Sequence, residues 1–426
     1  MGASDPAALP ALHIRPARGW LNDPNGMVRR DGVWHVFFQH NPARAQHGDI
    51  HWGHVSSPDL VTWTEHPVAF GPTPGGPDAG GCWSGAFVPW GEAAVAYTAI
   101  VDDPAYGTVC VRYARDPALD HWSEPVVVAQ TPAGVGEMRD PFFFEWAGER
   151  YALLGAGLTD GTPVLLLFSC ADLGAWTFLG EWLRPGAAAL ARAADAQIWE
   201  CPQLVEIDGS WVLVVSIWAH GETVRAEHVV GGLETDARGL PRFVPRVGGP
   251  VDLGSIFYAP QILAGGSSDG VSPLLLGWLR QEPASDDAGP DAVSGCLTLP
   301  RRLRLDGDRL IMEVDPAVRA LVGPPVELGA DGLAPAQALV TARALEAGEP
   351  GRLVLSGVNG PVEVHVLGEV EVWVDGEVVE IYDLTDPTNP PVSIRQDGTT
   401  SWRVEAYGLE LAVAALTLPA RARARA

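Results

Sequence analysis

The sequence predicts an all-β protein, a five-bladed β-propeller followed by a C-terminal β-sandwich. Short runs of apolar and β-branched residues recur along the chain, each bounded by Gly, Pro, Asp or Asn. The 426 residues include 49 Gly, 37 Pro and 16 Trp, a composition that favours many turns between short strands. Long amphipathic helical patterns are nearly absent. With 47% hydrophobic residues, the chain can bury a large core.

The first three hundred residues contain six clear strand predictions. They are VWHVFFQH (33–40), AVAYTAIV (94–101), TVCVRYA (108–114), RYALLGAG (150–157), PVLLLFS (163–169) and WVLVVSIW (211–218). The Ala-rich run GAAALARAADAQ (186–197) is compatible with either one short helix or a loop.

A weak internal repeat indicates the number of blades. Three segments share a Ser or Ala start, an Asp and Leu, and a Trp: SSPDLVTWTEHP (56–67), ARDPALDHWSEP (114–125) and SCADLGAWTFLG (169–180). Their Trp residues, Trp63, Trp122 and Trp176, are 59 and 54 residues apart. A period of this size, with about four strands per unit, is typical of a β-propeller, and residues 10–310 would hold about five units. The alternative is a β-sandwich whose hairpins end alike.

The pattern of the chain changes after about residue 312. Apolar runs there alternate or are continuous, and Asp375-Gly376 is a hairpin signal between two of them. The predicted strands are 352–357, 362–368, 370–383, 401–408 and 409–418. We therefore expect a propeller domain over residues 1–312 and a sandwich domain over residues 313–426. The second domain is expected to begin with a linker at 317–329 and to end in a frayed basic tail, ARARARA.

The composition excludes several classes of partner. Asp and Glu number 53 against 28 basic residues, all of them Arg, so the formal net charge is −25. Nucleic acid and anionic membranes require basic contacts, so neither is expected as a partner. No apolar run reaches the roughly 18 residues of a membrane span, and no secretory signal pattern opens the chain. The five Cys are scattered, so we expect reduced, buried thiols in a cytoplasmic protein.

No cofactor or metal site is predicted. The sequence contains no Gly-rich phosphate loop, no HExxH or GxSxG motif and no His/Cys cluster with metal-ligand spacing. Six histidines crowd one stretch, but their irregular spacing favours hydrogen-bonding positions over metal ligands. They are His35, His40, His47, His51, His54 and His66.

Three carboxyl groups stand in unusual local settings. Asp23 lies in GWLNDPNGMV, where Pro and an Asn-Gly pair supply a turn, and capping that turn is the simpler alternative. Asp140 lies in EMRDPFFF beside Arg139, and such neighbours are usually solvated surface groups. Glu200 lies in AQIWECPQLVEI, where apolar neighbours disfavour a charged carboxyl group, as a general acid requires. If each begins a strand of a different blade, the three meet at the propeller axis, and two such groups suffice for glycoside cleavage.

These motifs resemble the signature of a known family. WLNDPNG (20–26), RDP (139–141) and ECP (200–202), in this order, resemble the three signature motifs of glycoside hydrolase family 32, the β-fructofuranosidases. Further similar segments cover essentially the whole chain: FFQHNP (37–42), HGDIHWGHVSSPDLVTW (47–63), CWSGAF (82–87), IFYAPQ (256–261), LLLGW (274–278), SGCLTLPRRL (294–303) and VWVDGEVVEIY (372–382). Membership implies a five-bladed propeller followed by a sandwich, in agreement with the repeat count.

The resemblance implies a reaction and roles for three residues. The family hydrolyses terminal β-D-fructofuranosyl bonds with retention of configuration. By motif, Asp23 corresponds to the nucleophile that forms a fructosyl-enzyme ester. Glu200 corresponds to the acid/base, which protonates the leaving oxygen and then deprotonates water, and Asp140 to the stabiliser that holds fructose hydroxyls. The expected partner is a small carbohydrate, sucrose or a short fructo-oligosaccharide, and the expected assembly is a monomer or homodimer.

The resemblance also implies a substrate pocket. Its residues would be Asn22, Gln39, His47, Trp52, Trp83, Ser84, Arg139 and Trp278. Trp52 and Trp278 are expected to form the aromatic wall, because an aromatic face suits the C–H face of a sugar. His47 stands where some members have Trp, and Ala86-Phe87 replace the commoner Ser-Ala, so both positions bear on substrate range. A 6-phosphate would need a basic pocket, and the absence of Lys favours unphosphorylated sugars.

Three alternatives use the same residues. A sucrose-6-phosphate hydrolase would differ only in the leaving-group side of the pocket. In a fructosyltransferase, a second sugar would replace water at the ester. An inactive sugar-binding propeller is the third, and the retained carboxyl groups argue against it because binding alone does not use a buried acid/base pair.

Overall fold

The structure is a computed structural model that describes residues 10–264, 272–285, 287–328, 331–346, 348–418 and 422–423. Across these residues the protein is all-β, as predicted, and the helical segments are three short turns. They are η1 (Pro104–Tyr106), η2 (Ala188–Ala193) and α1 (Pro316–Arg319). Residues 186–197 were expected to form either one short helix or a loop, and η2 confirms the short helical segment. In the described part of the chain, no helix is long and apolar enough to cross a membrane.

The described residues up to Val314 form five sheets, each built mainly from consecutive strands. The first contains β1 (Gly19–Arg30), β2 (Val33–Asn41), β3 (His51–Ser57) and β4 (Thr64–Glu65), with β19 (Val293–Ser294) parallel to β1. The second contains β5 (Gly81–Phe87), β6 (Ala94–Ile100), β7 (Thr108–Tyr113) and β8 (Val126–Gln130). The third contains β9 (Val135–Trp146), β10 (Glu149–Leu158), β11 (Pro163–Ser169) and β12 (Thr177–Leu183).

The last two of these sheets follow the same plan. The fourth contains β13 (Ile198–Ile207), β14 (Ser210–Ala219), β15 (Glu222–Thr235) and β16 (Pro241–Pro250). The fifth contains β17 (Phe257–Leu263), β18 (Leu274–Leu279), β20 (Cys296–Leu297), β21 (Arg301–Asp306) and β22 (Arg309–Val314). The six strand runs predicted for this part of the chain are confirmed, with ends that differ by at most one residue.

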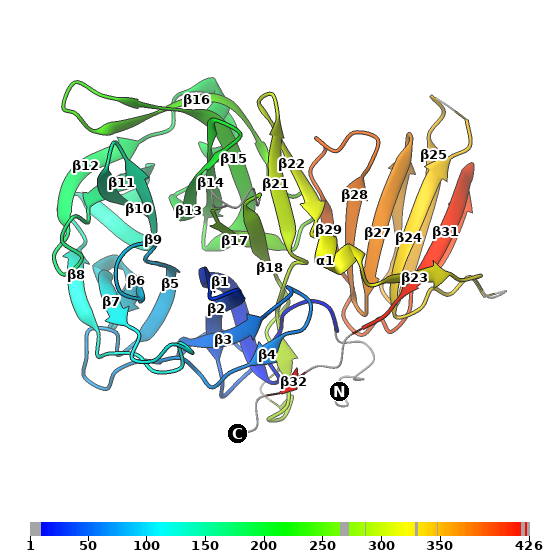
Figure 1. The fold of residues 1–426 in the computed structure, drawn as a ribbon, viewed down its shortest axis with the longest axis horizontal. Coiled ribbons are helices and arrows are strands. Elements are labelled where there is room, and N and C mark those ends of the chain that lie inside the picture. The colour runs from blue at the N-terminus through cyan, green and yellow to red at the C-terminus, as the bar shows by residue number, and fades with distance from the viewer. Residues whose placement is uncertain are drawn as a thin grey trace.

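The first strands of the five sheets form a ring. β1 contacts β5, β5 contacts β9, β9 contacts β13, β13 contacts β17, and β17 contacts β1 again. Figure 1 shows these strands gathered about one centre, with the later strands of each sheet lying outward. Side chains from five distant parts of the sequence therefore meet at one place.

The Trp repeat marks equivalent positions in successive sheets. Trp63 lies between β3 and β4, Trp122 between β7 and β8, and Trp176 between β11 and β12, always between the third and fourth strands. Trp63 and Trp122 are partly buried against hydrophobic clusters, and Trp176 is a buried member of one. The repeat fades after the third sheet, where the connection between β15 and β16 contains no Trp.

The first strand of each sheet, its inner strand, contains a β-bulge: two of its residues have no partner in the register with the second strand. The bulged pairs are 22–23, 83–84, 140–141, 201–202 and 259–260. Bulges bend a strand and redirect its side chains, and they are common beside active sites. Pro occupies three of them, at 141, 202 and 260, where a residue without an N–H leaves no ladder bond unmade. The residues before these prolines, Asp140, Cys201 and Ala259, have positive φ values of 60°, 46° and 42°.

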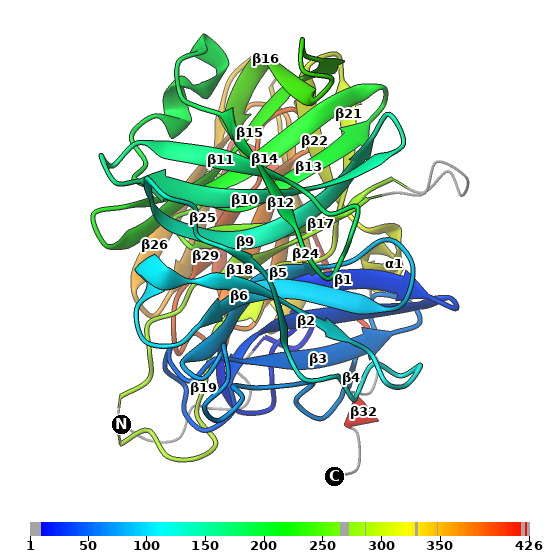
Figure 2. The same ribbon diagram turned by 90° about the vertical axis from the view of Figure 1, so that its left-hand side faces the viewer.

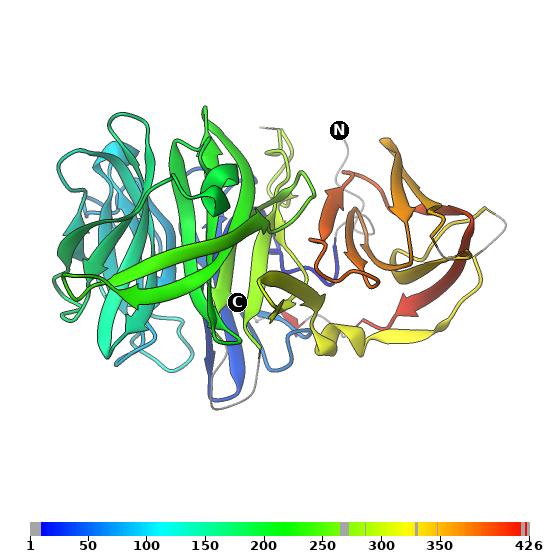
Figure 3. The same cartoon turned by 90° about the horizontal axis from the view of Figure 1, so that it is seen from above.

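The rest of the chain forms two sheets that enclose a second core. One contains β23 (Val322–Pro325), β31 (Leu409–Leu416), β24 (Gln337–Ala344), β27 (Glu369–Asp375), β28 (Val378–Asp383) and β29 (Val392–Arg395). The other contains β26 (Gly360–Val366), β25 (Gly351–Gly357) and β30 (Arg403–Tyr407). Figure 3 shows them beside the ring of sheets. The core between them includes Leu353, Val372 and Trp402, all fully buried.

Two expectations for this region are corrected. The segment 317–329 is not a plain linker, because β23 pairs with β31 and so belongs to the sheet. In the tail, the two described residues form β32 (Ala422–Arg423), which pairs in parallel with β4 and lies close to it in Figure 2, so these two residues are not frayed. The other tail residues lie outside the described residues.

A buried ionic network joins the two parts of the molecule. Arg301 on β21 binds Oδ2 of Asp252 at 2.8 Å and Oε2 of Glu380 on β28 at 2.7 Å. His13 binds Oδ2 of Asp375 at 2.7 Å and Oε1 of Glu380 at 3.0 Å. Burial lowers the pKa of His13, but the two carboxylates outweigh it and raise that pKa to about 8. The C-terminal sheets are thus held against the fifth sheet by charges as well as by apolar contacts.

Candidate active site

A cavity of about 350 Å³ lies at one end of the inner strands. Its lining residues come from all five sheets of the ring: Trp20, Asn22, Asp23, Gln39, His47, Trp83, Arg139, Asp140, Glu200, Trp218, Gly221, Thr223, Tyr258 and Trp278. The three predicted carboxyl groups therefore share one pocket, although more than 170 residues separate Asp23 from Glu200. All three side chains are buried.

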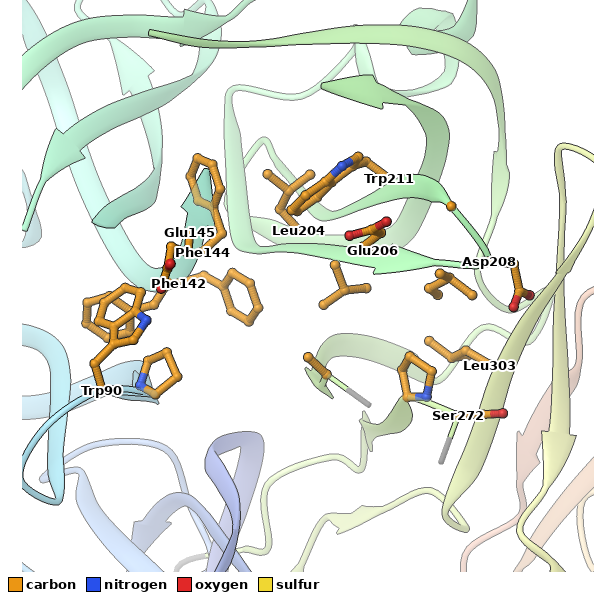
Figure 4. A pocket seen from close by; sticks show the side chains of 17 residues that line it. Trp90, Phe142, Phe144, Glu145, Leu204, Glu206, Asp208, Trp211, Ser272 and Leu303 are labelled. Carbon is orange, nitrogen blue, oxygen red and sulfur yellow. The ribbon is translucent and has the colours of Figure 1, made fainter. Parts of the chain in front are cut away.

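A second, larger cavity of about 650 Å³ lies further along the same strands. Figure 4 shows its aromatic and aliphatic lining, which includes Trp90, Phe142, Phe144 and Trp211, with the carboxyl groups of Glu145, Glu206 and Asp208 around it. All three of these carboxyl groups belong to exposed residues. The smaller cavity is the candidate active site because it holds buried titratable groups in mutual contact.

Asp23 is oriented by three neighbouring side chains. Its Oδ2 accepts hydrogen bonds from Ser84 Oγ at 2.5 Å and from Gln39 Nε2 at 2.9 Å, and its Oδ1 accepts one from Asn22 Nδ2 at 3.1 Å. Burial raises the pKa of Asp23 to about 6, against the opposing effect of the Ser84 hydrogen bond and with added repulsion from Glu200. The carboxyl group is thus fixed in position by hydrogen bonds, and its pKa lies closer to neutral pH than that of an ordinary Asp.

Asp140 is buried near Glu200 and Asp23, and both carboxyl groups repel its charge. Burial, followed by repulsion from Glu200, raises its pKa, while Arg139 opposes the rise. Its Oδ2 accepts the backbone N–H of Cys201 at 2.9 Å, and the Cys201 thiol lies 3.4 Å from the same oxygen and 3.6 Å from Oδ2 of Asp23. The Asp140 N–H in turn donates to Thr98 Oγ1 at 2.7 Å. The bulge at Cys201 therefore sets the distance between two of the three carboxyl groups.

Glu200 forms the centre of a chain of three polar groups. Oε1 accepts from Arg139 Nη1 at 2.8 Å, and Oε2 accepts from the Tyr258 hydroxyl at 2.6 Å. Arg139, Glu200 and Tyr258 each stand immediately before the bulge of their inner strand, on β9, β13 and β17. Equivalent positions on three neighbouring strands thus supply one hydrogen-bonded line across the pocket. Arg139 also pairs with Glu137.

Aromatic rings form the rim of the cavity. Trp20 packs edge to face on Trp278 with ring centroids 5.7 Å apart, and His47 lies 6.3 Å from Trp20 and 6.2 Å from Trp83. The guanidinium of Arg139 lies 5.4 Å from the Trp83 ring centroid. Such a rim provides apolar faces around a polar floor, the division that suits a sugar with C–H faces and hydroxyl edges.

Two predicted pocket residues do not line the cavity. Trp52 is fully buried, stacked on Phe70 at 5.0 Å, and its indole N–H donates to the Trp83 carbonyl at 3.1 Å. The expectation that it forms an aromatic wall is corrected, because alternation along β3 turns this side chain into the core. Ser84 lies behind Asp23, where it binds the carboxyl group instead of facing the cavity.

Sequence reasoning missed six residues that line the pocket or hold its carboxyl groups: Trp20, Cys201, Trp218, Gly221, Thr223 and Tyr258. Tyr258 had an available signal, since IFYAPQ repeats the pattern of ECP and RDP, with a polar side chain two residues before a bulge proline. Cys201 and Trp218 gave none, because their contacts exist only after β13 and β14 join the ring. All five Cys are buried, as predicted, and none is paired with another in the structure.

Three carboxyl groups and one guanidinium are thus buried together at the centre of the ring of sheets, beneath an aromatic rim. Sites of this kind cleave glycosides. Residues 13–314 match the model of the Glycosyl hydrolases family 32 N-terminal domain, and the chain belongs to that family.

Curated relatives agree with this assignment. The chain is 32% identical over 328 residues to a sucrose-6-phosphate hydrolase of Bacillus subtilis, covering 73% of this chain and 66% of the relative. It is 28% identical over 305 residues to a raffinose invertase of Escherichia coli, covering 69% of this chain and 62% of the relative. The chain thus spans somewhat less than two thirds of the length of these relatives.

Solved structures share the fold over nearly the whole chain. A Bombyx mori GH32 beta-fructofuranosidase superposes with a TM-score of 0.79 at 24% identity, covering 99% of this chain and 96% of that one. A sucrose-6-phosphate hydrolase of Lactobacillus gasseri superposes with a TM-score of 0.79 at 20% identity, covering 97% and 94%. At these identities the likeness establishes the fold.

Proposed function

We propose that the protein is a retaining β-fructofuranosidase that hydrolyses unphosphorylated sucrose or short fructo-oligosaccharides. The observation that carries the proposal is the meeting of Asp23, Asp140 and Glu200 in one buried pocket with Arg139. In this proposal residues 1–312 are a five-bladed catalytic propeller and residues 313–426 a β-sandwich. The substrate is a small carbohydrate, as the names of the relatives suggest. A cytoplasmic location and a monomeric or homodimeric state remain predictions.

The proposed reaction has two displacements. Asp23 attacks the anomeric carbon of the fructosyl unit while Glu200 gives its proton to the leaving oxygen, so that a fructosyl ester forms and the glycosidic bond breaks. Glu200 then takes a proton from water, whose oxygen attacks the same carbon and releases Asp23. Two inversions leave the configuration of fructose unchanged.

The neighbours of the reacting groups fit these roles. Asn22, Gln39 and Ser84 hold the Asp23 carboxylate by three donors, which fixes its direction of attack. Arg139 and Tyr258 each donate a hydrogen bond to one oxygen of Glu200, which fixes the orientation of its carboxyl group in the pocket. Asp140, with its backbone and thiol donors from Cys201, is placed to accept fructose hydroxyls.

We expect kcat/KM for sucrose to exceed that for sucrose 6-phosphate by about 10-fold or more, the cost of a charged group without a partner. Arg139 is the one arginine among the described lining residues, and Glu137 and Glu200 already occupy it. Burial lowers the pKa of His47, which disfavours the charged imidazolium that a phosphate would need as a partner. A panel of sucrose, its 6-phosphate, kestose, inulin and levan measures this directly. A preference for the phosphate would contradict the proposed substrate, and no release of fructose from any of them would contradict the function.

The pH dependence of kcat/KM should report the ionisation of Asp23. A nucleophilic carboxyl group must be deprotonated, and its pKa of about 6 places the loss of activity below pH 6, with a tenfold fall for each further pH unit. Ser84→Ala removes a hydrogen bond that lowers this pKa, so the acidic limb should move to higher pH. Initial rates from pH 4 to 8 test both statements. If the acidic limb lies at the same pH in Ser84→Ala as in the wild type, the ionisation of Asp23 is not its cause.

A further inference from the structure

We propose that His54, His66 and Asp120 form a binding site for a divalent transition-metal ion, Zn²⁺ by preference, at the junction of the first two sheets. His54 lies on β3, His66 directly follows β4, and Asp120 belongs to the connection between β7 and β8. One ligand atom from each residue lies within 4.8 Å of the other two. Two imidazoles and one carboxylate suit zinc and its transition-metal neighbours better than Mg²⁺ or Ca²⁺.

The three ligand atoms face one another at short range. Oδ1 of Asp120 lies 2.8 Å from Nδ1 of His66 and 3.3 Å from Nδ1 of His54. A tetrahedral zinc ion with bonds of about 2.0–2.1 Å holds its ligand atoms about 3.3 Å apart, so small rotations of the side chains would complete the site. The two imidazole rings lie parallel within 23°, with centroids 4.1 Å apart.

The buried histidine supplies an independent sign of a ligand. His54 is 1% exposed, and its Nδ1 makes no hydrogen bond within the described residues although it points to Asp120. A buried polar atom without a hydrogen bond costs roughly 1–3 kcal/mol, so a native structure normally satisfies it. A metal ion between this atom and Asp120 would do so.

The other ring nitrogens are already engaged in a way that favours metal binding. Nε2 of His54 lies 3.0 Å from Nδ1 of His35, and Nε2 of His66 lies 2.7 Å from the Ser56 hydroxyl. When a ligating imidazole donates its remote N–H to a neighbour, the lone pair of its other nitrogen is directed at the metal. Both Nδ1 atoms then face Asp120, and Nδ1 of His66 would exchange its present 2.8 Å hydrogen bond with Oδ1 of Asp120 for the metal ion.

The site is accessible and separate from the active-site cavity. The side chains of His66 and Asp120 are 17% and 25% exposed, which gives the ion a path and leaves room for a water as fourth ligand. None of the three residues lines the catalytic cavity. The sequence spacing concealed the site because its third ligand comes from the next sheet.

Calorimetric titration of the chelator-treated full chain with ZnCl₂ tests the proposal. We expect one ion per chain, and a melting temperature that rises with the logarithm of free zinc. His66→Gln and Asp120→Asn should each weaken binding by about 100-fold or more, since either removes one of three ligands. His121→Gln is the matched control, because this exposed histidine is adjacent in sequence but pairs with Asp116, and it should bind as the wild type does.

Three results would overturn the site. They are the absence of saturable zinc binding in the wild-type chain, equal binding by both ligand variants and the wild type, and loss of binding in Glu200→Gln. The last result would place the ion among the active-site carboxyl groups.

Discussion

Replacing Glu200 with Gln is expected to lower kcat for sucrose by about 10²- to 10⁴-fold, the range that general acid–base catalysis contributes. The amide keeps the shape of the side chain and its place between Arg139 and Tyr258, but it has no proton to give to the leaving oxygen. The leaving group of an aryl β-fructofuranoside needs little protonation. With this substrate, the rate of ester formation in Glu200→Gln should therefore stay much closer to the wild-type rate. Initial rates on both substrates and the pre-steady-state burst with the aryl substrate measure these effects.

Glu206→Gln provides the control for this experiment. Glu206 lies on the same strand, β13, but it is exposed and belongs to the other cavity. Its replacement should leave kcat unchanged. Equal losses for the natural and the activated substrate in Glu200→Gln would show that the residue positions the substrate and does not supply the proton.

Replacing Arg301 with Met is expected to lower the free energy of unfolding by about 3–5 kcal/mol, the usual cost of breaking a buried ion pair. The guanidinium is fully buried and compensates the carboxylates of Asp252 and Glu380, which are also fully buried. Its removal leaves Asp252 without its buried cation and Glu380 with His13 as its remaining cationic partner, in the interface between the fifth sheet and the C-terminal sheets. Denaturant unfolding followed by tryptophan fluorescence measures the change.

Arg304→Met is the matched control for the network. Arg304 also lies on β21 and pairs with Glu313, but both side chains are exposed, so its loss should cost about 0–1 kcal/mol. If Arg301→Met and Arg304→Met shift the unfolding midpoint equally, the buried network is not what holds the two parts together.

The strands were predictable because their signals are local. Runs such as 163–169 are apolar, β-branched or aromatic, and turn residues bound them, so the sequence alone defines their ends. The linker at 317–329 failed this test, since β23 becomes a strand only by pairing with β31, which lies far along the chain. The recurring Trp indicated the repeat because a large side chain between the third and fourth strands packs against a hydrophobic cluster in three successive sheets.

The site was predictable in its charged residues and less so in its surroundings. Asp23, Asp140 and Glu200 stand in motifs whose Pro and Gly residues reflect the bulges that redirect them. The misplacement of Trp52 has a simple cause, since side chains alternate along β3 and the motif does not say which face looks inward. The contacts of Cys201 and Tyr258 arise only when inner strands distant in sequence meet in the ring.

The proposed two-step reaction requires Asp23 to form a covalent bond to the fructosyl unit. Mass spectrometry of Glu200→Gln after incubation with an aryl β-fructofuranoside tests it most directly, because this variant can form the ester but hydrolyses it slowly. We predict a mass increase of one fructosyl unit on the tryptic peptide 19–29, localised to Asp23 and absent from Asp23→Asn. A fructosyl group on another residue, or a product of inverted configuration without any adduct, would contradict the mechanism.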